Sequence, residues 1–396
     1  MNWRCVGYVL SLVAAPGVTD ASERLVLTVT EPVGIHRDAA PVHARLELPR
    51  PVAPETKFRL VANGKPVAAQ FRSNGKGDTA DWWLDFVGRS APFEKRQYVI
   101  EYGDGVTPSP EPSRGHRLIQ RDDDFVISNA PHIDWTVPSD FRGFLRSVDF
   151  TPSEHLRPDS LGFTVRDRDG RTHQLGGDGT KATVIRAGRL AVALQFSGRF
   201  ADSKLQDVSW TADLVFPGPV SWVDAQLRLN DPQNRIEEIN LQLRLNLDQP
   251  TRRSRTLVDL GAGRTIYRSL MTGSQVELRA NGNEQPSWQV LRGSTGQLLP
   301  FVVAPEGAAF AEGWAHVMDR QRCLAIAFDR FGEHGPERIN IQADGTLTAS
   351  KSFADKVPKT WRTWLHFVHF PPRQSAATDP YMMQHPLIAQ QVDAPN

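Results

Sequence analysis

One predicted strand, residues 239–247, carries a ladder of hydrogen-bonding side chains. Its odd positions are all leucine or isoleucine, and its even positions are Asn240, Gln242, Arg244 and Asn246. Side chains alternate between the two faces of a strand, so the apolar ones are predicted to face the core and the polar ones to share the other face. Amides donate and accept hydrogen bonds, as sugar hydroxyls require, and a guanidinium can bind a carboxylate through two hydrogen bonds. The strand therefore predicts a site for a uronate-containing glycan, and the alternative is a solvated outer face of a sheet.

Eliminative cleavage of such a glycan needs a cation at the carboxylate, a base for the C5 proton and an acid for the leaving oxygen. We predict that Arg244 neutralises the carboxylate. His132, in a predicted turn, and Tyr267, which follows a glycine-containing stretch, are the predicted proton-transfer residues. Hydrogen bonding to nearby backbone is the alternative role for His132. Further histidines that merit consideration for proton transfer are His316, His334, His366 and His369.

Three residues near the C-terminal end are predicted to bind substrate together with the ladder. Glu312 and Trp314 are two positions apart and share a face of the chain, where a carboxylate beside an indole suits sugar recognition. His366 lies in a predicted strand, on the face opposite His369, so these two histidines cannot bind one metal ion without a bulge. We assign Glu312, Trp314 and His366 to substrate binding, and core packing is the alternative for Trp314.

Other kinds of chemistry find little support in the sequence. Closely spaced sets of His, Cys, Asp and Glu with zinc-ligand spacing are absent, and Cys323 lies in an apolar run typical of a buried structural thiol. The glycines at 261 and 263 lack the third glycine and the helix that a dinucleotide fingerprint needs, and no nucleophile-elbow motif occurs. We therefore expect neither a metal nor a cofactor.

The elements that position these residues are predicted to be strands. Short apolar runs separated by Pro, Gly and Asn recur along the chain, and no window of a dozen residues shows a capped helical period. Residues 105–114 are rich in Pro and Ser, which predicts a linker between a small domain, 22–104, and a large domain, 115–375. Residues 376–396 are predicted to form a tail. The fold class is therefore all-β.

Composition limits the partners of the 396-residue chain. Its 46 Lys and Arg balance 45 Asp and Glu, so there is no net field to attract nucleic acid or an anionic membrane. Residues 1–21 combine a basic start, an apolar run too short to span a membrane and small residues, which is the layout of a secretory signal. We expect a secreted or periplasmic protein that binds neither nucleic acid nor membranes.

Several segments in both halves of the chain follow a known pattern, namely 31–38, 41–42, 46–49, 66–71, 81–86, 98–103, 311–319, 325–331, 344–347 and 364–366. In these segments the chain resembles the exo-rhamnogalacturonan lyase-like family. The resemblance covers roughly residues 25–375 and consists of structural patterns without a catalytic signature. It implies a small N-terminal RIFT-like barrel followed by a large antiparallel β-supersandwich. Members of the family usually carry a C-terminal α/α toroid, which we expect to be missing here, so that a helical partner chain is one way to complete the cleft.

These observations lead to one functional hypothesis and two alternatives. The hypothesis is a polysaccharide lyase that cleaves pectin-like or rhamnogalacturonan-like glycans by β-elimination. It requires the polar face of residues 239–247 and Tyr267 to line one concave surface. The alternatives are a non-catalytic glycan-binding protein and an extracellular interaction module with no sugar site.

Overall fold

The computed structural model describes nine segments of the chain and is almost entirely made of strands. Five antiparallel sheets contain all of the longer strands, and the helical elements are η1 (Ser203–Leu205) and α1 (Thr378–Gln384). The prediction of an all-β fold is confirmed. Among these residues, no helix is long and apolar enough to cross a membrane, and the predicted signal at 1–21 lies outside them. The described residues are 23–129, 132–150, 153–248, 255–263, 265–282, 287–294, 296–354, 359–369 and 378–392.

An N-terminal unit is built from two sheets that enclose one hydrophobic core. Strand β1 (Glu23–Thr30) illustrates this packing, because alternate residues are buried and Leu27 lies fully buried between the two sheets. The first sheet has the order β30 (Ile388–Val392), β1 (Glu23–Thr30), β7 (Lys95–Tyr102), β3 (Phe58–Ala62), β4 (Lys65–Val67). The second has the order β2 (Arg37–Val52), β6 (Thr79–Ser90), β5 (Ala69–Ser73).

The remaining three sheets form a large β-sandwich around a second core. The nine-stranded sheet has the order β15 (Lys181–Ala187), β16 (Ala191–Arg199), β17 (Ser209–Pro217), β18 (Trp222–Asn230), β29 (Lys359–His369), β26 (Arg322–Phe328), β25 (Trp314–Met318), β20 (Thr256–Gly261), β21 (Thr265–Leu270). The eight-stranded sheet has the order β14 (Thr172–Gln174), β13 (Gly162–Asp167), β19 (Ile236–Arg244), β28 (Thr346–Ser352), β27 (Glu337–Gln342), β22 (Ser274–Ala280), β23 (Trp288–Ser294), β24 (Gln297–Val303). The five-stranded sheet has the order β12 (Ser153–Glu154), β11 (Ser147–Phe150), β10 (Ile133–Pro138), β9 (Asp124–Asn129), β8 (Arg117–Arg121).

Buried polar contacts join the N-terminal unit to the sandwich. The Gln70 side chain accepts a hydrogen bond from the Leu190 amide (3.1 Å) and donates one to the Ala191 carbonyl (3.3 Å). Asp85 is fully buried and lies 3.0 Å from Arg186 Nε of the sandwich. Burial acts to raise the pKa of Asp85, but His43 and Arg186 outweigh it and hold this pKa below its usual value. The junction therefore contains an ionised carboxylate with partners from both parts.

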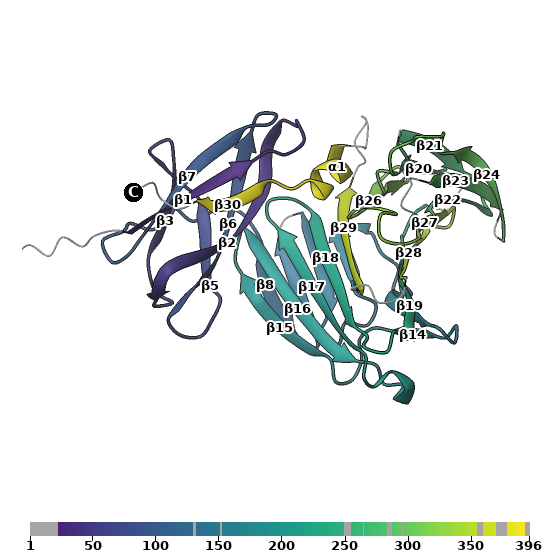
Figure 1. Ribbon diagram of the computed structural model, residues 1–396, viewed down its shortest axis with the longest axis horizontal. Coiled ribbons are helices and arrows are strands. Elements are labelled where there is room, and N and C mark those ends of the chain that lie inside the picture. Colours follow the sequence, from purple (N-terminus) through teal and green to yellow (C-terminus); the bar gives the residue numbers. More distant parts are fainter. Residues whose placement is uncertain are drawn as a thin grey trace, which may run out of the picture.

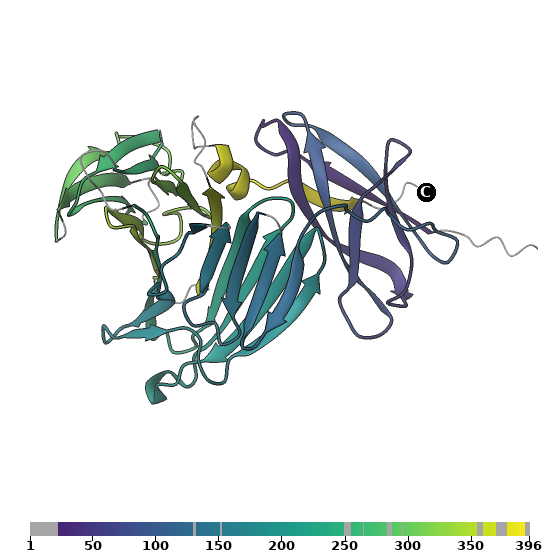
Figure 2. The same ribbon diagram turned by 180° about the vertical axis from the view of Figure 1, so that it is seen from behind.

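The C-terminal segment 378–392, here called the strap, also connects the two parts. Its helix α1 lies on the nine-stranded sheet, and β30 then pairs with β1, with Gln390 opposite Thr28. Figure 1 shows the strap in yellow running from the sandwich to the N-terminal unit, and Figure 2 shows the same bridge from behind. Where the sequence predicts a tail for 376–396, the structure therefore has a helix and a strand, which are stabilised by tertiary contacts that the local sequence does not encode.

Candidate functional site

The predicted ladder on β19 lies on the outer face of the eight-stranded sheet. The alternation is as expected, because Ile239, Leu241 and Leu243 are fully buried in the core. Asn240 and Gln242 are half-buried opposite Ser350 and Thr348 of β28. The Arg244 guanidinium is ion-paired with Asp159 and lies 3.8 Å from Asp344. Two carboxylates of its own chain therefore already neutralise the cation.

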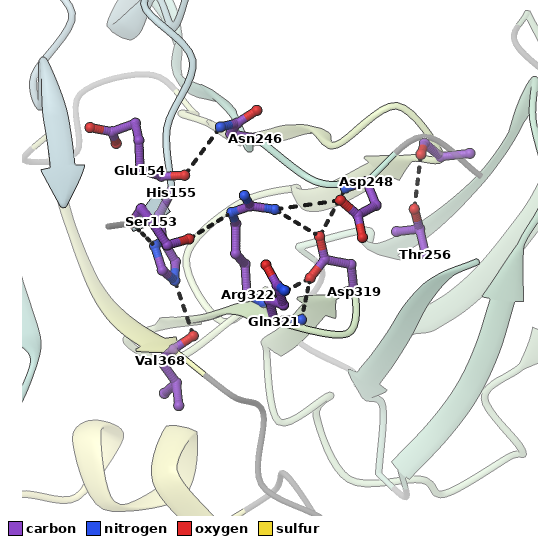
Figure 3. Close-up of polar contacts among 11 residues, drawn as sticks. Ser153, Glu154, His155, Asn246, Asp248, Thr256, Asp319, Gln321, Arg322 and Val368 are labelled. Carbon is purple, nitrogen blue, oxygen red and sulfur yellow. Dashed lines mark hydrogen bonds and ion pairs between the residues drawn. The ribbon is translucent and has the colours of Figure 1, made fainter. Parts of the chain in front are cut away.

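Asn246 belongs to a different polar network, at one end of the sandwich. Its side-chain amide donates to the Glu154 carbonyl at 3.2 Å, and its backbone amide donates to the His155 carbonyl. Figure 3 shows this network continuing to Arg322, whose Nε donates to Ser153 Oγ and whose Nη1 lies 3.3 Å from Asp319. The Asn246 contacts join the segment after β19 to β12, and the Arg322–Ser153 contact joins β26 to β12. The role of Asn246 in substrate binding stays a prediction.

The predicted site residues are distributed over different sheets. Tyr267 lies in β21, where its backbone pairs with Asp259 in the nine-stranded sheet, whereas Arg244 lies in the eight-stranded sheet. His132 is exposed in the turn between β9 and β10. β19 and β21 belong to different sheets, so strand pairing does not place the β19 ladder beside Tyr267, and a single surface lined by both stays a prediction.

Glu312, Trp314 and His366 do come together, on the outer face of the nine-stranded sheet. Trp314 Nε1 donates to Glu312 Oε2 at 2.6 Å. Trp314 is nevertheless fully buried, because Met383 of α1 packs onto a cluster that also contains Trp222 and Trp364. We call this surface the α1-covered face. Trp314 is therefore packed like a core residue, which was the alternative for it, and it also forms a hydrogen bond to a carboxylate.

Polar contacts fix α1 on this face. The side-chain amide of Gln384 donates to the carbonyls of Glu312 (2.6 Å) and Phe328 (2.8 Å). Asp379 Oδ2 lies 3.3 Å from His366 Nδ1, and this interaction lowers the pKa of Asp379. The helix is therefore anchored at both ends.

Two further titratable groups, His316 and Asp259, lie on the neighbouring strands β25 and β20. Burial lowers the pKa of His316 to about 3, so its ring is neutral. Asp259 pairs with His316 across β20 and β25, and burial raises the pKa of its carboxyl group. Because His316 is 3% exposed and Asp259 8% exposed, this cluster is closed to a glycan. Within the described parts of the chain, no group of three or more metal-binding side chains is arranged to hold a metal ion.

An open cavity of about 380 Å³ adjoins the α1-covered face at Glu312, and we call it the α1 pocket. Tyr381 and His385 of the strap line it, one helical turn apart, with ring centroids 4.5 Å from each other. Burial and the nearby Arg37 lower the pKa of His385, which favours the neutral imidazole. Other lining residues include Phe310, Phe331, Asp329, Arg330 and Glu333.

A second cavity, of about 600 Å³, lies on the other side of the loop that carries Arg330. Lys351 lines this pocket and lies 3.2 Å from the carboxylate of the fully buried Glu337. The other Glu337 oxygen accepts a hydrogen bond from the Gly332 amide at 2.5 Å. Burial raises the pKa of Glu337 to about 7 despite the nearby ammonium group.

This raised pKa predicts that stability falls as the pH rises. Glu337 has an ordinary value of 4.5, so between 4.5 and about 7 the folded protein holds a proton that the unfolded chain has released. The contribution of this proton to the free energy of unfolding is up to about 3 kcal/mol. It is fully present below pH 4.5 and is lost as the pH rises through 7. Glu337→Gln cannot titrate, so its free energy of unfolding should decline less between pH 5 and pH 8. Urea unfolding at the two pH values measures this, and an unchanged decline would contradict the prediction. Glu333→Gln, an exposed change in the same loop, is the matched control.

Of the residues that line the α1 pocket, the sequence-based assignment included Glu312 and missed the others. Tyr381 and His385 lie in the segment predicted to be a tail, and Arg330 lies in a loop with no motif. One local signal was present, because Asp379 and Pro380 are residues typical of a helix start. A helix there places Tyr381 and His385 on one face.

Comparison with known proteins gives a fold but no sequence family. No protein-family model and no curated protein matches the chain. Among solved structures, a protein in glycosyl hydrolase family 38 from Enterococcus faecalis is similar, with 12% identity, a TM-score of 0.54 and coverage of 93% of this chain and 47% of that one. An α-mannosidase from Enterococcus faecalis V583 has 11% identity, a TM-score of 0.55 and coverage of 93% and 46%. The chain thus spans just under half the length of these proteins, and its all-β sandwich fold is similar to the part that it covers.

Proposed function

We propose that this chain is a carbohydrate-active protein that binds a glycan in the α1 pocket and cleaves it by β-elimination next to a uronate. The observation that carries the proposal is that Arg330, Tyr381 and His385 line one cavity. These are the three side-chain types that elimination needs. The fold shared with a glycosyl hydrolase family 38 protein and an α-mannosidase supports a glycan substrate. The resemblance of the sequence to exo-rhamnogalacturonan lyase-like proteins supports the lyase reaction.

Each of the three residues has one role in the proposed reaction. Arg330 pairs with the uronate carboxylate and so makes the C5 proton more acidic. The neutral His385 takes that proton, and the electrons of the C5–H bond form the double bond between C4 and C5. The C4–O bond breaks, and the Tyr381 hydroxyl donates a proton to the departing oxygen. Water then returns the lost proton to Tyr381 and removes the one on His385.

The charge of the α1 pocket suggests which glycans it accepts. Glu312, Asp329 and Glu333 line it together with a single arginine, so carboxylates outnumber cations. Carboxylates accept hydrogen bonds from sugar hydroxyls but repel further uronates. We therefore expect glycans in which uronates alternate with neutral sugars to be better substrates than polymers of uronate alone.

An ultraviolet assay tests the proposal directly. The protein is incubated with an alternating uronate glycan, with polygalacturonate and with a neutral polysaccharide, and the absorbance of the new C4–C5 double bond is followed. We expect the fastest rise with the alternating glycan and none with the neutral one. Binding without product in calorimetry would support the non-catalytic alternative, and the absence of both binding and product would leave the interaction-module alternative.

Four of the sequence predictions that remain proposals can be tested individually. Arg244, His132 and Tyr267 can be tested as Arg244→Gln, His132→Ala and Tyr267→Phe in the same assay, where loss of product would restore their proposed roles. Export is the fourth, and N-terminal sequencing of the protein recovered outside the cytoplasm would show whether residues 1–21 are removed.

A further inference from the structure

A third cavity lies where the N-terminal unit meets the sandwich, and we call it the junction pocket. Its volume is about 430 Å³. Residues of β3 and β5 line one side, and Gly188 and Arg189, between β15 and β16, line another. Pro108 and Pro112 of the connecting segment complete it. The pocket shares no lining residue with the α1 pocket.

Two guanidinium groups, one from each part of the molecule, are anchored at this pocket by backbone carbonyls. Arg72 Nε donates to the Ala187 carbonyl at 3.2 Å, and its Nη1 donates to the carbonyl of Phe71. Arg189 Nη1 donates to the carbonyls of Pro112 (2.8 Å) and Ser113 (3.2 Å). A carbonyl orients a guanidinium but does not neutralise its charge. In the part of the chain that the structure describes, neither arginine forms an ion pair, so both keep charge and unused N–H groups for an anion.

The same pocket offers an aromatic surface. Phe71 is half-buried and stacks on Phe58, with ring centroids 4.8 Å apart and planes 16° apart. The ring centroids of Trp82 and Phe58 lie 4.5 Å apart. Phe71 is therefore packed in an aromatic cluster, and it lines the pocket together with the cationic Arg72. Aromatic rings pack well against the apolar face of a pyranose.

The charges at the pocket leave a small positive excess. Lys57, Arg72 and Arg189 line it against Glu55 and Glu111. This balance favours a ligand with one negative group and several hydroxyls, because the two carboxylates can accept hydrogen bonds from hydroxyls but would repel a second anionic group.

We propose that the junction pocket is a separate binding site for one anionic sugar unit of a polysaccharide, with its oxyanion between Arg72 and Arg189 and its ring on Phe71. The site would hold a chain at the junction while another part of the same polysaccharide reaches the α1 pocket. The proposal goes beyond the proposed catalysis, and neither depends on the other, because the two pockets have no residue in common.

Isothermal titration tests this site with a short oligosaccharide that carries one galacturonate among neutral sugars, here called the mono-uronate oligosaccharide. Arg330→Gln removes the cation of the α1 pocket, so this variant isolates the junction pocket. In the Arg330→Gln background, Arg72→Gln and Arg189→Gln should each weaken binding about tenfold or more, since each removes charge-assisted hydrogen bonds. Arg199→Gln, an exposed change at the end of β16, should have no effect. Thermal denaturation of every variant verifies folding, since both arginines also hold backbone in place.

Two further probes separate the anion from the sugar. Phe71→Leu should weaken binding of the mono-uronate oligosaccharide but not of inorganic sulfate. Binding of sulfate without binding of the mono-uronate oligosaccharide would reduce the pocket to a simple oxyanion site and overturn the proposal. The proposal would also be overturned if the Arg330→Gln protein bound the mono-uronate oligosaccharide equally well with and without Arg72→Gln and Arg189→Gln. This holds whatever the outcome of the elimination assay.

Discussion

Replacing His385 by alanine is expected to lower kcat for β-elimination by about 10²–10⁴-fold, the usual contribution of a general base. Among the residues that line the α1 pocket, His385 is the one histidine, and its ring lies against the ring of Tyr381. The substitution therefore removes the proposed nitrogen base. Binding should be affected much less, because Arg330 and the three carboxylates remain. Steady-state kinetics on the alternating uronate glycan separates the two effects.

The pH profile gives this prediction a signature that a purely structural role would not have. Because burial and Arg37 lower the pKa of His385 below the ordinary 6.5, the free base persists in mildly acidic solution. The acid limb of kcat/KM should therefore fall below pH 6.5 and should disappear in His385→Ala. Tyr381→Phe should also lose activity while keeping the acid limb.

His36→Ala is a matched control for the histidine substitution. His36 is an exposed histidine of the N-terminal unit, paired with Asp38. Full activity of this variant together with full activity of His385→Ala would rule out the proposed base. Loss of activity in His385→Ala with loss of the folded state would be uninformative alone, so Tyr381→Phe, which removes one oxygen atom, carries the test in that case.

The secondary structure was predictable because alternation is a local property. Along β19 every second side chain is apolar, and Ile239, Leu241 and Leu243 are indeed fully buried. The face of each residue followed from its position in the strand. The partner of each strand did not, because pairing joins residues that are far apart in sequence. The predicted surface combined β19 with β21, which follow each other closely along the chain but lie in different sheets.

The candidate site was predictable only where neighbours in sequence are also neighbours in space. Glu312 and Trp314 form a hydrogen bond two residues apart, as their spacing indicated. Tyr381 and His385 reach the pocket only because α1 packs on the nine-stranded sheet and β30 pairs with β1 at the other end of the chain. The strap is a short segment whose structure depends on those distant partners, so composition alone predicted a tail.

Replacing Arg37 by alanine is expected to destabilise the protein by about 3–5 kcal/mol, as breaking a buried ion pair does. Arg37 is 2% exposed, and its Nη2 lies 2.9 Å from the equally buried carboxylate of Glu31. Burial acts to raise the pKa of Glu31, but Arg37 and backbone amides hold it below its usual value. Without the arginine, a buried carboxylate would have to be ionised without a cation or take up a proton.

The same guanidinium also holds the strap, so the expected damage is local as well as global. Its Nη groups donate to the carbonyls of Met382 (3.4 Å) and His385 (2.5 Å), which fixes the end of α1 next to the N-terminal unit. Hydrogen exchange in residues 378–392 should therefore increase in Arg37→Ala beyond the change in the rest of the chain. Elimination activity should fall too, since His385 loses its fixed position.

Arg50→Ala is the matched control, because it removes an arginine–glutamate pair that is solvent-exposed. Arg50 pairs with Glu23, and its side chain is 72% exposed. Exposed pairs contribute about 1 kcal/mol or less, so this variant should unfold almost like the wild type and keep normal exchange in the strap. Adding Glu31→Gln to Arg37→Ala should recover part of the lost stability, because it removes the unpaired charge, but it should not restore protection of the strap. Equal free energies of unfolding for Arg37→Ala and Arg50→Ala would contradict the stabilising role of the buried Arg37–Glu31 pair. Unchanged hydrogen exchange in residues 378–392 of Arg37→Ala would contradict the role of Arg37 in holding the strap.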